Sequence, residues 1–332
     1  MDARPFARRW SKRLSILYLV AVAAGGVWYA LGADDRALTM LFLYGPRCVA
    51  ALPMIPLVPL ALLGRSAWGS ALLAATALGL AGPWMGGRLS YSGLTGDSGS
   101  GSRYRVVTWN AGGGSPAQTF KTWLVESGAD IVAVQESPDT LSPADFPAEW
   151  HVRDGNGRLR LASKYPTRFL ESIGTGELPL PGAAARFRLE TPDGPLTVCN
   201  VHLSTPREGI QTALASKFTN LTDLRTTMDL QARSSHAVRA WVGEPAGLTL
   251  IAGDFNMPVE TRLYRRDWGH LQNAFSEAGN GWGGTKMTSW HRIRIDHILF
   301  APPFRARRCT VGPDLGSDHL PTVADLAIEG NP

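Results

Sequence analysis

The stretch Ile251-Ala-Gly-Asp-Phe-Asn-Met-Pro258 decides the fold class of this 332-residue chain. It continues an apolar run that starts at Leu248, and such a run predicts a buried strand. The strand ends at Gly253, and the polar residues Asp254 and Asn256 follow it. A carboxylate and an amide at the end of a core strand can be held rigidly and directed into a site. Taken alone, the pattern is equally typical of an ordinary turn, in which Asp and Asn are common.

The sequence around this stretch alternates short apolar strands with a few helices. Further strands are expected at 104–110, 131–134, 158–162, 184–189, 196–203, 293–300, 305–311 and 322–328, and helices at 117–126 and 224–241. Many strands with few helices favour two packed sheets covered by helices. We therefore expect one layered α/β domain over about 103–329.

Several of these strands end in, or are interrupted by, polar side chains of the same kind. The set comprises Asn110, Glu136, Asn200, His202, Asp296, His297, Asp318 and His319. Oxygen donors without cysteine suit a hard divalent cation such as Mg²⁺. Histidines beside such a cation can donate to phosphoryl oxygens or move protons. The set therefore indicates metal-assisted hydrolysis of a phosphate ester.

These residues occur in six motifs whose order resembles that of the endonuclease/exonuclease/phosphatase superfamily, which includes DNase I. The motifs are Thr-Trp-Asn110, Val-Gln-Glu136, Asn200-Val-His202-Leu, Gly-Asp254-Phe-Asn256, Ile-Asp296-His297 and Ser-Asp318-His319. The resemblance covers Arg103 to about Ile328. It implies a four-layered α/β sandwich with its site at one end of the two sheets. It also implies a Mg²⁺-dependent hydrolase of phosphoric esters or anhydrides, with Mn²⁺ as the alternative ion.

The resemblance implies two groups of site residues. Metal binding would fall to Glu136 as the principal ligand, with Asn110 and Asp318. Catalysis would fall to His202, Asp254, Asn256, Asp296 and His319. In that second group, Asp254 would orient or deprotonate the attacking water, and Asn256 would hold the phosphate. The two histidines would stabilise phosphoryl oxygens and serve the leaving group, while Asp296 would fix the tautomer of His319.

Other polar residues have simpler interpretations. His297 is expected to be a core histidine or a neighbour of the site. Arg160, Arg186 and Arg207 could clamp a phosphate, but exposed positions on a solvated face are the favoured interpretation.

The three cysteines of the chain do not make a disulfide framework. Cys199 and Cys309 are expected to be isolated buried thiols, and whether they pair with each other stays open.

The first third of the chain predicts a membrane anchor. Apolar stretches at about 14–33, 45–64 and 67–85 approach the length needed to cross a bilayer. Five basic residues precede the first stretch, which places the N-terminus in the cytoplasm. We expect residues 1–89 to form a three-helix transmembrane anchor, joined by a Gly- and Ser-rich linker at 90–102 to a domain outside a bacterial cell membrane. The middle stretch contains Arg47 and several prolines, and two crossings instead of three would leave that domain inside.

The distribution of charge bears on the substrate. Up to Ser102 the chain has nine basic and four acidic residues, whereas from Arg103 onward it has 24 of each. The neutral domain argues against a nucleic-acid substrate, which a basic surface would track.

The anchor and the catalytic motifs together resemble the VanJ-type membrane proteins, which are linked to teicoplanin resistance. Those proteins are thought to act on undecaprenyl pyrophosphate during recycling of the cell-wall lipid carrier. The resemblance implies a membrane lipid phosphate as the substrate. Two alternatives stay open: a phosphodiesterase of nuclease or sphingomyelinase/phospholipase C type, and a binding module without catalysis.

Overall fold

A computed structural model describes residues 4–31, 37–91, 103–112, 117–174 and 182–329. The chain divides into two compact units, Met1–Arg88 and Leu89–Pro332. Most of the linker expected at 90–102 lies outside the described residues, as does part of the glycine-rich segment at 112–114.

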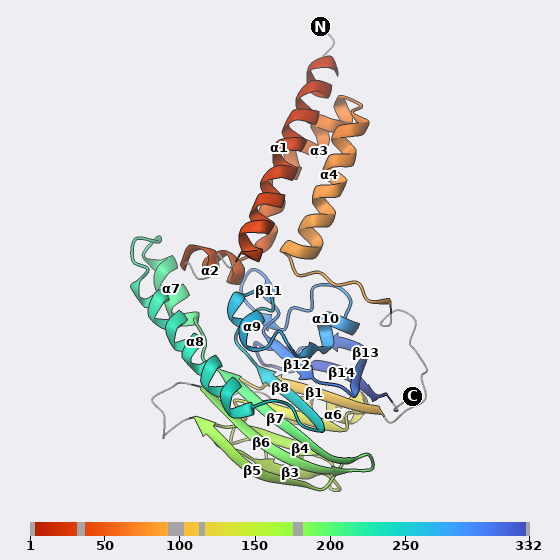
Figure 1. Cartoon of the computed structure of the whole chain (residues 1–332), viewed down its shortest axis with the longest axis vertical. Helices are drawn as coiled ribbons and strands as arrows, with labels where there is room; N and C mark the ends of the chain where they lie inside the picture. Colours follow the sequence, from red (N-terminus) through yellow and green to blue (C-terminus); the bar gives the residue numbers. More distant parts are fainter. Residues whose placement is uncertain (1–3, 32–36, 92–102, 113–116, 175–181, 330–332) are drawn as a thin grey trace. The chain divides into compact units, whose positions relative to one another are not determined.

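The second unit contains two six-stranded mixed sheets (Figure 1). The first sheet has the order β13 (Phe304–Val311), β14 (Thr322–Ile328), β1 (Arg103–Asn110), β2 (Ile131–Gln135), β4 (Arg160–Ser163) and β3 (His151–Asp154). The second sheet has the order β5 (Thr167–Gly174), β6 (Gly182–Thr191), β7 (Gly194–Leu203), β8 (Leu248–Asp254), β12 (Asp296–Phe300) and β9 (Gln272–Asn273).

The two sheets pack face to face through one apolar core. Val106 and Ile131 of the first sheet and Val198 and Leu250 of the second are fully buried in the same cluster. These residues alternate along their strands with others that face the outer helices, as a strand's two-residue period requires. Burial of both faces explains why the strands read as nearly continuous apolar runs.

Helices cover the outer faces of both sheets. Helix α6 (Ala117–Ser127) packs on the first sheet, where Phe120 stacks on Trp109 with ring centroids 4.9 Å apart. Helix α8 (Thr222–Val242) packs on the second sheet through Val238. The layers are therefore helix, sheet, sheet and helix, which fits the expected α/β sandwich.

Shorter elements complete the second unit. They are the helices α7 (Arg207–Ala215), α9 (Arg262–Asp267) and α10 (Ala274–Ala278), the 3₁₀ turn η4 (Pro143–Asp145), and a small hairpin of β10 (Lys286–Met287) and β11 (Arg292–Ile293). Cys48, Cys199 and Cys309 are all free, and the last two lie in different sheets.

The strand register brings the polar strand ends together. Strands β1 and β2 are parallel and end at the paired residues Asn110 and Gln135. Strands β7 and β8 are also parallel, and His202 pairs with Asp254. Strand β12 runs antiparallel to β8 and starts at Asp296, opposite Asp254. The carboxyl ends of four strands and the start of a fifth therefore supply the site.

The first unit is helical. It contains α1 (Arg4–Ala30), α2 (Ala37–Tyr44), η2 (Arg47–Ala51), α3 (Met54–Leu63), α4 (Ala67–Gly79) and η3 (Leu80–Trp84). Helices α1, α3 and α4 share a small core of Tyr18, Val22, Leu57, Ala61 and Leu73. Arg47 donates to the backbone carbonyls of Leu43 and Trp84, at 3.0 and 3.3 Å.

This unit corrects the expectation of a transmembrane anchor. Among the described residues, no helix combines the length and the apolar character needed to cross a membrane. The prolines of the middle stretch divide it into η2 and the ten-residue α3, and α4 has 13 residues, whereas a span needs about 20. Helix α1 is longer, but its first ten residues include five basic ones. The predicted three spans, the multi-pass membrane topology and the extracytoplasmic placement are therefore not supported.

Candidate active site

Asp254 lies at the centre of the polar edge formed by these strand ends. It is the last residue of β8 and is 1% exposed. The backbone N–H of Asn256 donates to Asp254 Oδ1 at 2.8 Å, and Asn256 Nδ2 donates to the carbonyl of Leu203 at 2.8 Å. Asn256 has φ of 52°, a left-handed conformation that asparagine tolerates better than most residues. The turn after β8 therefore holds the carboxylate in a fixed orientation.

Gly253 allows this strand to end where it does. A Cβ atom at this position would lie 1.8 Å from the carbonyl oxygen of Val201 on the neighbouring strand β7. Its φ of 156° is also one that side chains rarely adopt. Gly253 thus permits the close approach of β7 and β8 that places His202 beside Asp254.

Asn110 links the two sheets at the site. Its Nδ2 donates to Glu136 Oε1 and to Asp254 Oδ2, both at 3.0 Å, and its Oδ1 accepts from the backbone N–H of Gly112 at 2.9 Å. Glu136 directly follows β2 with φ of 47°, and 37% of its side chain is exposed. Asn110 therefore joins a buried carboxylate from one sheet to an accessible carboxylate from the other.

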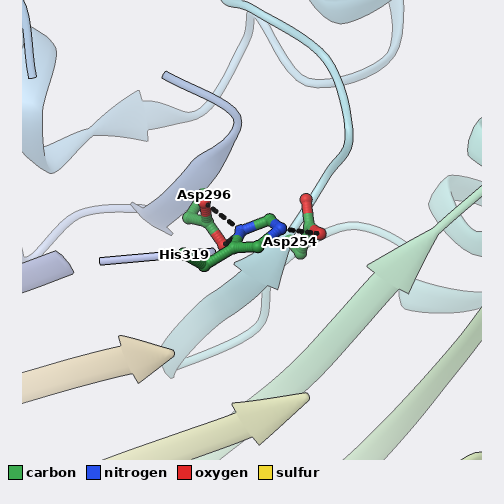
Figure 2. A group of neighbouring side chains, drawn as sticks. All are labelled: Asp254, Asp296 and His319. Atoms are coloured by element: carbon green, nitrogen blue, oxygen red, sulfur yellow. Dashed lines mark hydrogen bonds and ion pairs between the residues drawn. The ribbon is translucent and has the colours of Figure 1, made fainter. Parts of the chain in front are cut away.

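His319 lies between two carboxylates (Figure 2). Its Nδ1 is 3.0 Å from Asp296 Oδ2, and its Nε2 is 3.7 Å from Asp254 Oδ2. All three residues are about 1% exposed. A ring nitrogen that donates to Asp296 fixes the orientation of the imidazole and leaves Nε2 directed toward Asp254. This is the arrangement of a histidine positioned for proton transfer.

A second histidine, His202, lies near the same oxygen of Asp254 as His319. His202 Nε2 lies 3.5 Å from Glu136 Oε1 and 3.8 Å from Asp254 Oδ2. About a quarter of its side chain is exposed, so a ligand can reach it. Two imidazoles and two carboxylates thus converge within a few ångströms.

The environment shifts the proton affinity of the buried groups. Burial raises the pKa of Asp254, and the nearby Asp296 carboxylate raises it further. Burial alone would lower the pKa of His319, but the carboxylates of Asp296 and Asp254 outweigh it and raise the pKa to about 9. His319 is therefore a proton donor at neutral pH, next to a carboxylate with increased proton affinity.

The donor set fits a divalent cation. Ligand atoms of Asp254, Asp296 and His319 all lie within 4.8 Å of one another and could hold an ion. Glu136 adds an accessible carboxylate that shares the amide of Asn110 with Asp254. Carboxylate oxygens concentrated in this way repel one another unless a cation offsets their charge, and oxygen donors suit Mg²⁺ or Mn²⁺. In the structure Asn110 presents Nδ2 to the carboxylates, so its oxygen could reach a cation only after rotation of the amide.

Asp318, which the sequence predicts as a metal ligand, has a cationic partner in the structure. It forms an ion pair with Lys286 of strand β10, and about half of its side chain is exposed. Its Oδ1 lies 3.9 Å from His319 Nε2, so it borders the site. Burial would raise its pKa, but Lys286 outweighs burial and lowers it. Sequence reasoning missed Lys286, because an isolated lysine on a two-residue strand follows no motif or period.

Three further polar residues hold the segments around the site in position: Gln135, Asn200 and Thr285. Gln135 Nε2 donates to Asn200 Oδ1 at 2.6 Å, and Asn200 Nδ2 donates to the carbonyl of Val134 at 2.9 Å. Thr285 Oγ1 accepts from the backbone N–H of Asp296 at 3.2 Å. Asn200 therefore ties the sheets together under Glu136. The pair Gln135-Glu136 at the end of β2 was the sequence signal for the contact between Gln135 and Asn200. No sequence signal pointed to Thr285.

Other candidates are structural. His297 is 1% exposed, bonds the carbonyl of Met257 at 2.9 Å, and has its pKa lowered to about 4 by burial. This confirms it as a core histidine. Arg160 pairs with Asp154, and Arg186 bonds the carbonyl of Trp241.

Solved structures of other proteins have folds similar to that of the second unit. An endonuclease/exonuclease/phosphatase family protein from Bacteroides thetaiotaomicron has a TM-score of 0.52 and 15% identity, covering 70% of this chain and 97% of that one. A mannosyl-6-phosphatase from the same organism has a TM-score of 0.50 and 14% identity, with 68% and 100% covered. Truncated TDP2 from Caenorhabditis elegans has a TM-score of 0.50 and 16% identity, with 68% and 98% covered. At these identities the likeness shows the fold alone.

No curated protein sequence matches the chain significantly. The family model of the Endonuclease/Exonuclease/phosphatase family matches residues 107–319, which include every site residue described above. The match spans well over half of the chain, from β1 to His319. The chain belongs to the Endonuclease/Exonuclease/phosphatase family.

Proposed function

We propose that this protein is a divalent-metal-dependent phosphoesterase that releases a terminal phosphate from a lipid-linked phosphate or diphosphate. The observation that carries the hydrolytic part is the convergence of five side chains from both sheets at their strand ends: Asn110, Glu136, His202, Asp254 and His319. Family membership and the fold shared with a mannosyl-6-phosphatase support a phosphoesterase.

Each residue has a role that its geometry supports. Asp254 is fixed by two amides and would orient the attacking water, or accept its proton. His319 carries a proton at neutral pH and would donate it to a phosphoryl oxygen or to the leaving oxygen. His202 is accessible beside Asp254 and would bind a second phosphoryl oxygen. A bound divalent cation would supply Lewis-acid neutralisation of phosphoryl charge, and the accessible carboxylate of Glu136 would help to hold it.

The lipid part of the proposal has separate support. Leu31, Trp68 and Leu78 of the first unit are 70% or more exposed, and Trp290 of the second unit is 89% exposed. Most of the large apolar side chains that are exposed among the described residues belong to the first unit, and extensive apolar surface of this kind is typical of regions that contact lipid or another protein. A substrate whose leaving group carries a long apolar chain, such as undecaprenyl diphosphate, would match them. A contribution to glycopeptide resistance depends on that substrate and stays a prediction.

A phosphate-release panel tests the substrate class. Purified protein with Mg²⁺ would be offered farnesyl and undecaprenyl diphosphate, sphingomyelin, a phosphoinositide and plasmid DNA. We expect phosphate from the lipid diphosphates, and loss of that activity in a folded Asp254→Ala variant. Hydrolysis of DNA or sphingomyelin with the lipid diphosphates left intact would favour the phosphodiesterase alternative and contradict the proposal.

A further inference from the structure

A lysine that the family motifs do not include lies at the edge of the site. Lys286 of strand β10 is 8% exposed and forms an ion pair with Asp318. Lysine is rarely buried to this extent, because removing an ammonium group from water is costly unless an anion compensates it. Its position therefore requires a nearby negative charge.

The backbone fixes Lys286 against the catalytic histidine. Lys286 forms an isolated antiparallel bridge with His319. On either side of the bridge, the N–H of Met287 donates to the carbonyl of Asp318, and the N–H of Leu320 donates to the carbonyl of Thr285, both at 2.7 Å. The ammonium group is thus tied to the segment that carries Asp318 and His319.

The ammonium charge of Lys286 also affects the proton affinity of the neighbouring site residues. Lys286 lowers the pKa of Asp318, and it also opposes the increase in the pKa of His319 that the carboxylates cause. Arg207, at the start of α7, acts on Asp318 in the same direction. Lys286 is the better placed of these two cations, because Arg207 is exposed whereas Lys286 is held in the bridge with His319.

The two partners of this ion pair differ in their access to water. About half of the Asp318 side chain is exposed, whereas only 10% of the Lys286 side chain is. Water can solvate the Asp318 carboxylate if the ion pair opens, so its loss costs little at that end. A ligand anion next to His319 Nε2, itself 3.9 Å from Asp318 Oδ1, would offer Lys286 a second acceptor.

We infer that Lys286 binds the terminal phosphate of the substrate and favours phosphomonoesters and diphosphates over phosphodiesters, an inference that rests on the proposed phosphoesterase activity. A terminal phosphate carries close to two negative charges at neutral pH, since its second pKa is about 6, whereas a diester carries one. The attraction to a fixed ammonium group scales with the ligand's charge. The carboxylates of Asp254, Asp296 and Glu136 repel the additional negative charge of a terminal phosphate. A cation at this position therefore matters more for binding a terminal phosphate than for binding a diester.

The test compares hydrolysis of p-nitrophenyl phosphate and bis(p-nitrophenyl) phosphate by the full chain at saturating Mg²⁺. In Lys286→Met we expect kcat/KM for the monoester to fall about tenfold to a hundredfold, the size of one lost hydrogen bond to a charged group. The diester should lose about the square root of that factor, because it carries half the charge. Lys286→Arg should restore the monoester preference. Inhibition by inorganic phosphate should weaken in Lys286→Met more than inhibition by dimethyl phosphate.

Matched controls separate this role from a structural one. Lys164→Met removes a more exposed lysine–aspartate ion pair, with Asp130 at 2.8 Å, at the opposite end of strand β2, and should leave the preference unchanged. Asp318→Asn frees Lys286 from its ion pair. This variant should keep the preference for the monoester even if it hydrolyses both esters more slowly. Partial unfolding removes active protein for both substrates alike, so their ratio is insensitive to it, and saturating Mg²⁺ keeps the metal site filled in every variant.

The outcomes are distinct. Equal losses for both substrates in Lys286→Met, or loss of the preference in Asp318→Asn, would overturn the inference while leaving the phosphoesterase intact. A wild-type protein that hydrolyses neither ester nor any member of the lipid panel would refute the proposed function, and the inference with it.

Discussion

At the scale of single residues, the site depends on contacts that fix one side chain through another. Asp296 has no direct part in the proposed attack on phosphorus, yet it lies 3.0 Å from His319 Nδ1 and is fully buried. Its carboxylate both orients the ring and raises the pKa of His319. A change at Asp296 should therefore act through His319.

We predict that Asp296→Asn lowers kcat about a hundredfold or more while the protein stays folded, because an amide fixes the wrong tautomer and holds less charge. Phosphate release and circular dichroism measure the two effects. Mg²⁺ affinity serves as the control: Asp296 also belongs to the group that could hold an ion. A large loss of Mg²⁺ affinity at unchanged saturated kcat would instead make Asp296 a metal ligand.

Tyr104 gives a pH-dependent prediction away from the site. It is 1% exposed, and its hydroxyl donates to Thr191 Oγ1 and Asp193. Burial and Asp193 raise its pKa to about 12, above the unfolded value of about 10. The native state therefore holds the proton more tightly, so this contribution to stability is complete below pH 10 and is lost as the pH rises toward 12.

Tyr104→Phe should be less stable than the wild type at pH 8, by about 1–3 kcal/mol for the lost hydrogen bonds. The difference should shrink between pH 10 and 12. Urea unfolding followed by tryptophan fluorescence at several pH values measures both free energies. Parallel pH profiles for the two proteins would show that this tyrosine does not titrate in the way described.

At the scale of elements, the strands could be predicted because each carries its own apolar run with a polar end. Residues 248–254 and 322–328 are examples in which the sequence alone indicates both the strand and its end. The role of Asp254 followed from its place at such an end. The contact between Lys286 and Asp318 could not be predicted, because it joins a two-residue strand to a loop 32 positions away.

In the first third of the chain, the prediction of membrane-spanning helices was wrong. Hydropathy over a window counts apolar residues but does not locate breaks, and prolines divided the middle stretch into short helices. Element length then decided the outcome, since α2, α3 and α4 have only 8 to 13 residues.

Strand β8 gives the clearest test at this scale. Gly253→Ala should lower the free energy of unfolding by about 2–4 kcal/mol, since its Cβ would overlap the backbone of Val201 and force β7 and β8 apart. Urea unfolding measures the loss. Gly194→Ala is the matched control, because its φ of 106° is also positive but nothing lies within 4 Å of the added Cβ. Equal costs would show that backbone conformation, and not close strand approach, requires Gly253.

At the scale of the whole molecule, the two units have separate cores. The three apolar clusters of the second unit contain only residues from 104 onward, and the cluster of the first unit contains only residues 14–84. Every site residue belongs to the second unit. The first unit can therefore contribute to substrate access or location without being needed for the chemistry.

We predict that a chain of residues 89–332 folds and hydrolyses p-nitrophenyl phosphate with a kcat/KM within about threefold of the full chain, because each unit has its own core. Activity on a lipid diphosphate in vesicles should fall by a larger factor if the apolar first unit contributes to access. Failure of the shortened chain to fold would contradict the separation of the cores.

The central claim is that side chains from both sheets bind one divalent cation to hydrolyse a phosphate ester. The most direct measurement is phosphate release by chelator-treated protein during titration with Mg²⁺, for the wild type and for Glu136→Gln. The account predicts no release before Mg²⁺ is added, saturable recovery in the wild type, and a recovery in Glu136→Gln that needs at least about tenfold more Mg²⁺ or fails. Full activity in the presence of chelator, or an unchanged Mg²⁺ response in Glu136→Gln, would contradict it.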